Sequence, residues 1–384
     1  MGKRITTMTN YKTLEYTDKV ATEQKAAIER LLELLPPYVR EYAEYKEPKL
    51  AIKTRREYIQ DIFSFFSFMV DVIPECKNYI IKEIPLETLS SLSLDDFSAY
   101  ERWLMSESKG GGYNSPTTIK RKQSSLRSFY GYLYASDRIA VNPVAKIESV
   151  RVDSNDRDEI RVLTDKERQL FLAAIDKEYE DAVEKLEEAK AKAEKNDKPV
   201  AEAIRIKPAL AKRNKAIVYL FLGTGLRNSE LCAINCEDFS VDNEKINVIR
   251  KGKGKNKKKK KEAYVLLGTE VIHVLLEYLT EYREVIGPDT DNYDAMFLSS
   301  RHTRITPRAI EQMVEKYANE ALGKKNGVHP HVLRASFGDK YQATYKNILA
   351  TSEVMNHSST AVTAQYYLKR SEKSKEDAKK IPIL

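Results

Sequence analysis

Apolar residues recur at helical spacing through the first third of the chain. They do so after Leu50, again after Asp95, and a third time after Ser115-Pro116, a pair suited to the N-cap and first turn of a helix. We therefore expect three helices that bury one face each in a common core. The expected inward residues are Tyr58, Ile62, Phe65, Phe66 and Met69, then Phe97, Tyr100, Trp103 and Leu104, then Ile119, Leu126, Phe129, Tyr130 and Leu133.

Cations accompany the first and third of these helices. The ones expected to lie outward or in the preceding turn are Lys53, Arg55, Lys120, Arg121, Lys122 and Arg127. Charged side chains on a helix are usually only solvated. In a DNA-binding protein the same side chains would contact backbone phosphates, which give affinity without sequence information.

Breaks in these patterns divide the chain into four segments. Residues 1–45 predict a helix-rich lead-in, residues 46–145 a helical domain, and residues 146–161 a polar linker. Residues 162–384 predict a second domain, which opens with a capping box at Thr164 and Glu167 and carries a charged insertion at about residues 176–212.

Strand-like segments are expected at residues 246–249 and 263–267, on either side of a lysine-rich turn. The rest of the second domain has helical patterns. The fold class predicted is therefore mainly α, with a small antiparallel β-sheet in the second domain.

Composition adds a preference for polyanions. The 65 Lys and Arg exceed the 57 Asp and Glu, which gives a net charge of +8 and favours nucleic acid as a partner without deciding it. No apolar run reaches the roughly 18 residues that a membrane span requires. Three scattered cysteines predict a reducing compartment, and Cys232 and Cys236 lack the further ligands that a metal site needs. We expect a cytoplasmic protein that binds neither membrane nor metal.

Four separated segments carry candidate chemistry. A glycine turn at residues 223–225 leads into Arg227, with Glu230 three residues later. A lysine run covers residues 251–261. The remaining two segments hold His331 with Arg334, and His357 with Tyr366 nine residues after it. Each has an ordinary explanation when taken alone: a surface ion pair, a solvated turn, a structural histidine, or chance among 23 tyrosines.

In combination these segments resemble the tyrosine recombinases, the family of phage and conjugative-transposon integrases and Xer recombinases. The resemblance rests on Gly-Thr-Gly-Leu-Arg227-x-Ser-Glu230-Leu, Pro-His331-x-Leu-Arg334, His357 and Tyr366. The separation of 23 residues between Arg334 and His357 also matches the family, and the resemblance covers nearly the whole chain.

The resemblance implies a role for each of these residues. Arg227 and Arg334 would bind the non-bridging oxygens of the scissile phosphate, and Tyr366 would attack its phosphorus. His331 would act as the base or proton relay for a phenol whose pKa is about 10 when isolated. His357 would donate a further hydrogen bond to the phosphate, and Glu230 would orient the site.

The general acid that protonates the departing 5′-oxygen has two candidates. An ungapped count from Arg227 places the family's lysine at Lys251, and Lys253 in Gly-Lys-Gly is the alternative, which would also contact DNA. The chain departs from the family pattern at Ala335-Ser336 and at Asn356, neither of which replaces a reacting group. Tyr367 adjoins Tyr366, but the spacing favours Tyr366 as the nucleophile.

The resemblance also implies an architecture and partners. The family folds as a C-shaped clamp on DNA, made of a SAM-like helical core-binding domain and an α+β catalytic domain. It would imply double-stranded recombination sites, a homotetramer in the synaptic complex, an accessory directionality factor and no cofactor, in a bacterial cytoplasm or nucleoid. Target sequence and host stay open.

Several functions are compatible with these residues. Integration or excision of a mobile element is the first expectation, ahead of an Xer-like resolvase or a DNA invertase with the same chemistry. A relaxing enzyme like the type IB topoisomerases lacks the core-binding pattern. A DNA-binding regulator with a silent site would not need all the reacting residue types. An RNA-binding protein built on the lysine run leaves the other three segments unexplained.

Overall fold

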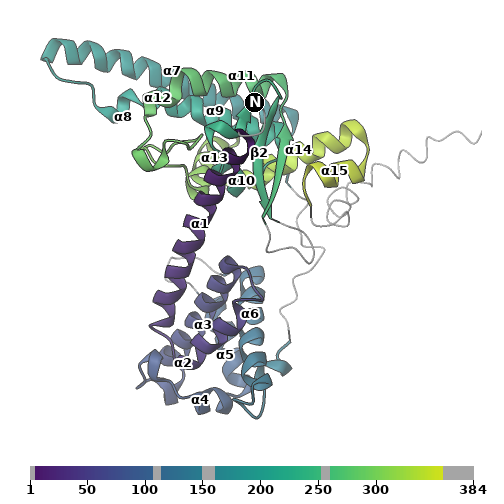
Figure 1. The fold of residues 1–384 in the computed structure, drawn as a ribbon. Coiled ribbons are helices and arrows are strands. Elements are labelled where there is room, and N and C mark those ends of the chain that lie inside the picture. The colour runs from purple at the N-terminus through teal and green to yellow at the C-terminus, as the bar shows by residue number, and fades with distance from the viewer. Residues whose placement is uncertain (1–4, 107–113, 149–160, 252–259, 358–384) are drawn as a thin grey trace, which may run out of the picture. The chain divides into compact units, whose positions relative to one another are not determined.

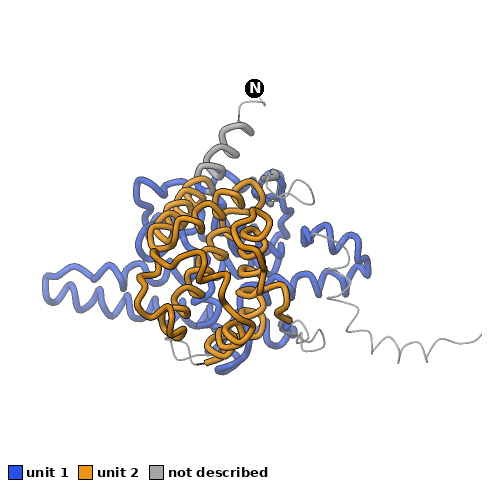
Figure 2. The backbone as a smooth tube through the Cα atoms, turned by 90° about the horizontal axis from the view of Figure 1, so that it is seen from below, with its two compact units in different colours: residues 1–16, 158–384 blue, residues 17–157 orange. Residues whose placement is uncertain are grey.

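The computed structural model describes residues 5–106, 114–148, 161–251 and 260–357. It divides into two compact units (Figures 1 and 2). The first unit along the chain comprises residues 17–157 (orange, keyed unit 2 in Figure 2), and the second comprises residues 1–16 with residues 158–384 (blue, keyed unit 1).

Helices make up the first unit. They are α1 (Ile5–Leu32), whose first part belongs to the other unit, α2 (Pro37–Lys46), α3 (Ile52–Val72), α4 (Leu86–Ser91), α5 (Leu94–Met105) and α6 (Pro116–Ala135), with short 3₁₀ turns at Pro74–Cys76, Ile81–Glu83 and Pro143–Lys146. Aromatic rings fill the space between α3, α5 and α6. Phe65 of α3 stacks on Phe97 of α5 with ring centroids 5.7 Å apart, and Tyr130 of α6 meets the Phe97 ring edge-on at 5.6 Å. Such pairs add to the free energy gained by burying the rings.

The predicted start of α6 is confirmed. The Ser115 hydroxyl accepts a hydrogen bond from the Thr118 amide at 3.2 Å, and Pro116 occupies the first turn. The five inward positions predicted for this helix are all buried. A cap and an apolar stripe are local features, which is why the sequence could predict both.

Residues 17–45 do not form a separate lead-in. Ile28 and Leu32 of α1 and Tyr38 and Val39 of α2 are buried in the same apolar cluster as the residues of α3, α5 and α6. The Tyr38 hydroxyl also donates to the Ile84 carbonyl at 2.9 Å. Because their apolar faces lie on the same core, these residues belong to the first unit.

The outward basic face is smaller than predicted. Arg55 is buried and pairs with Glu47 at 3.0 Å, while the Lys122 side chain is 13% exposed and lies 3.7 Å from the Asp61 carboxylate. The outward placement of Lys122 was therefore wrong, and Arg55 lies within α3 and not in the turn before it; each cation has an acidic partner in the same unit. Lys53 and Lys120 are exposed, as expected.

Asp61 joins α3 to α6 through three groups of α6. Its carboxylate is 1% exposed and accepts hydrogen bonds from Arg121 and, at 2.7 Å, from the Ser125 hydroxyl, with the Lys122 ammonium nearby. A buried carboxylate is tolerated only when such partners replace its lost hydration.

Replacing this carboxylate should destabilise the first unit. We expect Asp61→Asn to lower the free energy of unfolding by about 2 kcal/mol, less than for a fully buried pair because Arg121 is 41% exposed and can be hydrated. Trp103, the single tryptophan, lies in α5 and reports on this unit during denaturant unfolding. Asp71→Asn on the exposed end of α3 is the control. Equal midpoints for the two variants would contradict the role of Asp61.

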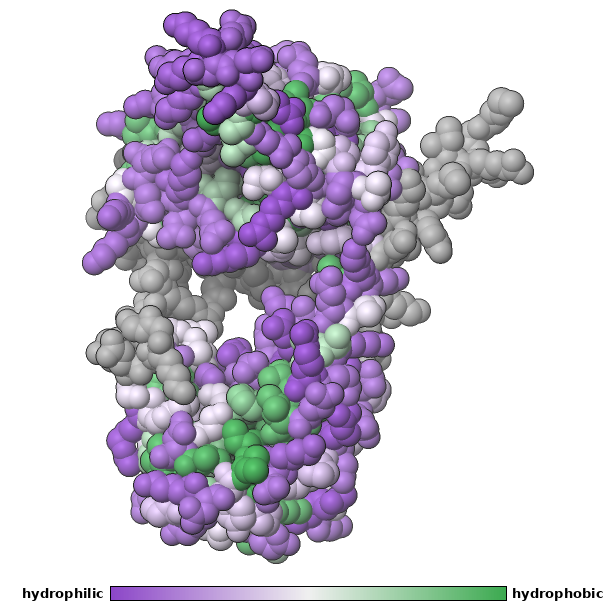
Figure 3. Space-filling model, turned by 90° about the vertical axis from the view of Figure 1, so that its left-hand side faces the viewer, coloured by the Kyte–Doolittle hydropathy of each residue, from purple (hydrophilic) through white to green (hydrophobic). Residues whose placement is uncertain are grey.

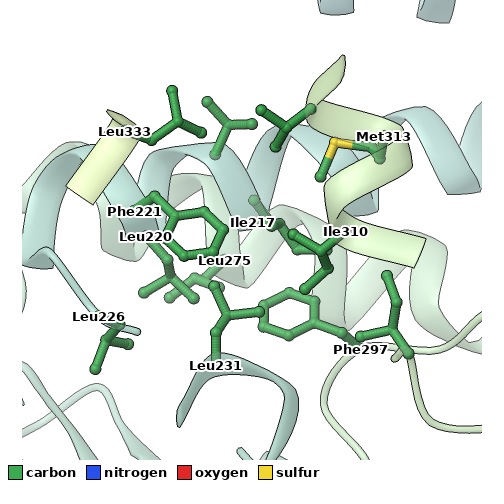
Figure 4. Close-up of a cluster of buried hydrophobic side chains, with 14 of the residues drawn as sticks. Ile217, Leu220, Phe221, Leu226, Leu231, Leu275, Phe297, Ile310, Met313 and Leu333 are labelled. Carbon is green, nitrogen blue, oxygen red and sulfur yellow. The ribbon is translucent and has the colours of Figure 1, made fainter. Parts of the chain in front are cut away.

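The second unit combines helices with one small sheet. Its helices are α7 (Asp165–Asn196), α8 (Glu202–Arg205), α9 (Lys207–Thr224), α10 (Asn228–Cys232), α11 (Thr269–Glu277), α12 (Arg283–Ile286), α13 (Pro307–Leu322), α14 (Pro330–Tyr345) and α15 (Ile348–Val354). A π-helical turn at Tyr278–Tyr282 links α11 to α12, and 3₁₀ turns lie at Cys236–Asp238 and Thr290–Asn292. The helix α9 is buried on nearly every side, and its Ile217, Leu220 and Phe221 lie at the centre of the core (Figure 4). None of the described helices is long and apolar enough to cross a membrane.

The sheet contains both predicted strands and one that was not expected. Its order is β1 (Phe239–Ser240), β2 (Lys245–Lys251) and β3 (Lys260–Leu266), all antiparallel. In β2, Ile246 and Val248 are buried, whereas Lys245 and Asn247 are partly exposed. This alternation defines an inner face of β2 that is turned toward the core.

The charged insertion forms an arm made of the end of α7 with α8. The capping box that starts α7 is present, with the Thr164 hydroxyl accepting from the Glu167 amide at 3.2 Å. Ala182 is the last buried residue of α7, and the helix continues for another 14 residues. The arm projects from the unit in Figure 1, and its surface is largely hydrophilic in Figure 3. The alternating charges of this segment therefore belong to a solvated helix.

Candidate active site

A sharp turn after α9 places Arg227. Gly225 ends the helix with φ +62°, a conformation that side chains with a Cβ rarely adopt. A Cβ on Gly225 would lie 2.5 Å from Cδ1 of Phe337 in α14 and 3.0 Å from the sulfur of Met355, which follows α15. Glycine is therefore needed here for two reasons, its backbone conformation and the close approach of two other segments.

Arg227 is held by Glu230, as its position in the sequence predicted. One oxygen of the nearly buried Glu230 carboxylate accepts the Arg227 amide at 3.0 Å, and the other accepts Nη1 of the Arg227 guanidinium at 2.8 Å. The Nη2 of Arg227 donates to the Asn356 carbonyl at 2.7 Å. The side chain remains 40% exposed, so a fixed guanidinium is presented to solvent.

Arg334 belongs to the same site and is more deeply buried than Arg227. It belongs to α14, is 2% exposed, and donates through Nη1 to the Gly225 carbonyl and through Nη2 to the Met355 carbonyl. Both arginines therefore link the 225–227 turn to the 355–356 segment: Arg227 extends from that turn to Asn356, and Arg334 donates to one carbonyl in each segment. Segments about 100 residues apart in the sequence are joined here by main-chain carbonyls.

His331 lies one helical turn before Arg334, on the first turn of α14. Its ring is parallel to that of His329, with centroids 6.3 Å apart. The His331 side chain is exposed on one side, but desolvation by the neighbouring protein lowers its pKa, and the positive charges of Arg334, His329 and Arg227 lower it further. The neutral ring, which can accept a proton, is thereby favoured.

This shift predicts a pH dependence. In the DNA-free protein His331 should titrate below its ordinary pKa of 6.5. Because the native state then binds fewer protons than the unfolded chain, the neutral ring's contribution to stability is full above pH 6.5 and is lost as the pH falls through the folded pKa. An NMR titration of the ring protons measures the midpoint, and His329→Gln should raise it by removing one cation. A midpoint at or above 6.5 would contradict the electrostatics described.

His357 follows α15 and completes the described part of the site. Its amide donates to the Ser352 carbonyl at 3.0 Å, and the residue is 8% exposed. Asn356 before it has φ +47°, an uncommon conformation that turns its carbonyl to Arg227. The prediction from sequence did not include this carbonyl, because nothing in a pattern of side chains identifies a main-chain acceptor.

The structure does not describe every predicted residue. Tyr366, Tyr367 and Lys253 lie outside the described residues. Lys251 ends β2, where its backbone pairs with Lys260, and the strand leads from the sheet into the lysine run. The structure thus brings together Arg227, Glu230, His331, Arg334 and the His357 segment, and the roles assigned to all the site residues stay predictions.

No group of three or more metal-binding side chains occurs within the described ranges. The cysteines there are buried or partly buried. Burial raises the pKa of the Cys232 thiol to about 12, and burial also raises that of Cys236. Both thiols are therefore protonated at neutral pH and suit apolar packing.

Comparison with known proteins places this geometry in context. The model of the phage integrase family matches residues 198–373. Tyrosine recombinase XerC of Thermodesulfovibrio yellowstonii is 30% identical over 316 residues, which cover 82% of this chain and 84% of that protein. Tyrosine recombinase XerS of Lactococcus lactis subsp. cremoris is 28% identical over 358 residues, which cover 88% and 93%.

A solved structure shows the same fold. The Tn1549 transposon integrase in complex with circular intermediate DNA aligns with a TM-score of 0.55 at 18% identity, over 86% of this chain and 94% of that one. At this identity the comparison concerns the fold alone. It includes both the helical unit and the unit that carries the site.

Proposed function

This chain belongs to the tyrosine recombinases of the phage integrase family, and from that premise we propose that it cleaves and rejoins DNA at specific sites through a covalent phosphotyrosine. The observation that carries the proposal is the convergence of Arg227 and Arg334 on one turn, with His331 a helical turn from Arg334. Two fixed guanidiniums beside a neutral imidazole suit a phosphodiester that exchanges one ester oxygen for another.

The proposed reaction is a transesterification. The Tyr366 oxygen attacks the phosphorus, His331 takes the phenolic proton, and the bond to the 5′-oxygen breaks. Lys251, or Lys253 as the alternative, protonates that oxygen, which leaves a 3′-phosphotyrosine and a free 5′-hydroxyl. The reverse steps rejoin the strands, and the ester conserves the energy of the original bond. His357 would donate a hydrogen bond to the same phosphate.

The contacts of the two arginines support preorganisation. Arg334 is held by two carbonyls, and Arg227 by Glu230 and a third carbonyl. Donors that are already oriented need no reorganisation when charge develops on the phosphate oxygens, and this is a large source of catalytic rate. Glu230 acts on Arg227 and is therefore a positioning residue.

We propose a more limited set of DNA contacts in the helical unit than the sequence predicted. Lys53 and Lys120 are exposed, and Arg121 is partly so. Arg127 is half-buried and donates to the Ile147 carbonyl at 2.9 Å, which leaves other guanidinium protons for a phosphate. Arg55 and Lys122 are left out because their charges face Glu47 and Asp61. Lys253 remains a proposed contact of the second unit.

The proposed working unit is a homotetramer on two double-stranded recombination sites in a bacterial cytoplasm, on the nucleoid, aided by a directionality factor. Integration or excision of a mobile element is the first proposal. An Xer-like resolvase or invertase is the second, and it is favoured by relatives named XerC and XerS.

A covalent-trapping assay tests the chemistry. The full chain is incubated with nicked duplexes drawn from the DNA that flanks its gene, so that the short strand released by cleavage diffuses away and rejoining is prevented. The expected product is a denaturation-resistant band that carries label from the 3′-phosphate side of the break and none from the 5′ side. Specific binding to a duplex with no band on any nicked form of it would indicate a silent DNA-binding regulator instead.

A further inference from the structure

Arg250 lies on the inner face of β2, where the sequence predicted no functional residue. It follows Ile246 and Val248 at alternate positions, and those two are buried in the core of the second unit. Side chains at alternate positions share one face of a strand, so Arg250 continues the row of inward side chains toward the end of the strand. Helix α10, which starts just after Arg227, packs against β2.

The Nε atom of Arg250 is buried and has no partner among the residues that the structure describes. No acidic side chain among the described residues lies within ion-pair distance of it, and Glu230 is already bound by Arg227. A desolvated cation without an acceptor costs free energy in the DNA-free protein.

The charges around Arg250 are those of the site. Burial lowers its pKa, the Glu230 carboxylate raises it, and the Arg227 guanidinium lowers it again. Arg250 therefore lies close enough to Glu230 and Arg227 for their charges to act on it, although it forms no ion pair or hydrogen bond with either residue. Another partly buried arginine of this unit does have acceptors: Arg304 donates to the Ile234 carbonyl at 2.9 Å and to the Asn235 side chain at 2.6 Å. A purely structural role would be expected to give Arg250 such contacts.

We propose that Arg250 is a third arginine of the site, which binds a backbone phosphate of the DNA at the point of cleavage. A phosphate oxygen would supply the acceptor that Arg250 lacks and the negative charge that offsets its proximity to Arg227. The inference rests on the proposed function, because it assumes that DNA enters the site beside Arg227. Arg250 also directly precedes Lys251, so a phosphate held by Arg250 would fix the start of the lysine run relative to the DNA.

A binding cycle with charge-deleted DNA tests this contact. Affinity is measured for duplexes in which one phosphate at a time is replaced by an uncharged methylphosphonate, with chains that carry Tyr366→Phe to avoid covalent trapping. We expect Arg250→Gln to weaken binding to unmodified DNA by about tenfold or more. At one phosphate, the methylphosphonate should weaken binding by the chain with Arg250 and have no further effect on Arg250→Gln.

The conservative variant and a matched control sharpen the cycle. Arg250→Lys keeps a cation and should restore sensitivity at that same phosphate. Arg205→Gln removes one exposed charge from the arm, where Arg205 pairs with Glu202, and should respond to every methylphosphonate as the parent does. Identical methylphosphonate effects in the parent and in Arg250→Gln at all positions would overturn the proposal.

The thermal stability of the DNA-free protein distinguishes a DNA-binding role of Arg250 from a structural one. Arg250→Met removes a desolvated cation that has no acceptor, so its Tm should equal or exceed that of the parent even though DNA binding weakens. A Tm lower by several degrees would assign Arg250 a structural role and overturn the proposal. The proposed function is judged separately, by adduct formation in the unsubstituted chain. The binding cycle can be run on any tightly bound duplex, whether or not an adduct forms.

Discussion

Tyr366→Phe should form no covalent adduct with DNA, a loss of at least about 10⁴-fold in the rate of cleavage, because phenylalanine has no oxygen to attack the phosphorus. Equilibrium binding to the same duplex should change little, since the substitution removes one hydroxyl group and no positive charge. The rate is measured as denaturation-resistant product on a nicked duplex, and binding as the mobility shift of the intact one.

Tyr367→Phe is the matched control for this prediction. It makes the identical chemical change one residue later, at the tyrosine that the family spacing does not favour, and it should retain adduct formation. Loss in Tyr367→Phe with retention in Tyr366→Phe would move the nucleophile by one residue. Retention in both variants would exclude each of these tyrosines as the nucleophile.

Gly225→Ala should disable the site and destabilise the second unit together. The positive φ at this position and the 2.5 Å approach of Phe337 should cost about 2–4 kcal/mol between them. Cleavage should fall by at least about 100-fold, because the Gly225 carbonyl orients Arg334, and a shift of about 1 Å in a positioned group has an effect of that size. Single-turnover adduct formation and thermal unfolding measure the two effects.

Two further variants separate the causes. Gly268→Ala has φ −76° and no atom within 4 Å of the added Cβ, so it should behave like the parent. Gly225→Ala combined with Phe337→Ala removes the closest contact and should recover part of the stability relative to the sum of the single variants. Strict additivity would show that Phe337 is not what excludes a Cβ, and parental behaviour of Gly225→Ala alone would refute the geometry of the turn.

Much of the fold follows from patterns that act over a few residues. The stripe in α6, its Ser115 cap, the capping box at Thr164 and the two main strands were all predicted and are present. Caps, stripes and strand alternation depend on neighbours within about one helical turn, so their chemistry is visible in sequence order. The pairing of Arg227 with Glu230 is local in the same way.

Other features depend on contacts between distant segments. The inward turn of Lys122 and Arg55, the inclusion of residues 17–45 in the first core, and the short strand β1 each depend on a partner that the local pattern does not identify. A cation on a helix points outward unless a buried carboxylate such as that of Asp61 pairs with it. The periodicity of the helix does not show where such a carboxylate lies.

The sequence by itself determined the candidates for the chemistry, because reacting side chains occur as types at fixed spacings: Arg227 with Glu230, His331 with Arg334, and His357 before Tyr366. Only the tertiary structure decided how they are held. The carbonyls of Gly225, Met355 and Asn356 that fix the two arginines, and the Arg250 Nε that has no acceptor among the described residues, lie in segments far apart in the chain. Every residue has a main-chain carbonyl, so the sequence does not indicate which carbonyls will serve as acceptors in a site. That is decided only when the chain has folded.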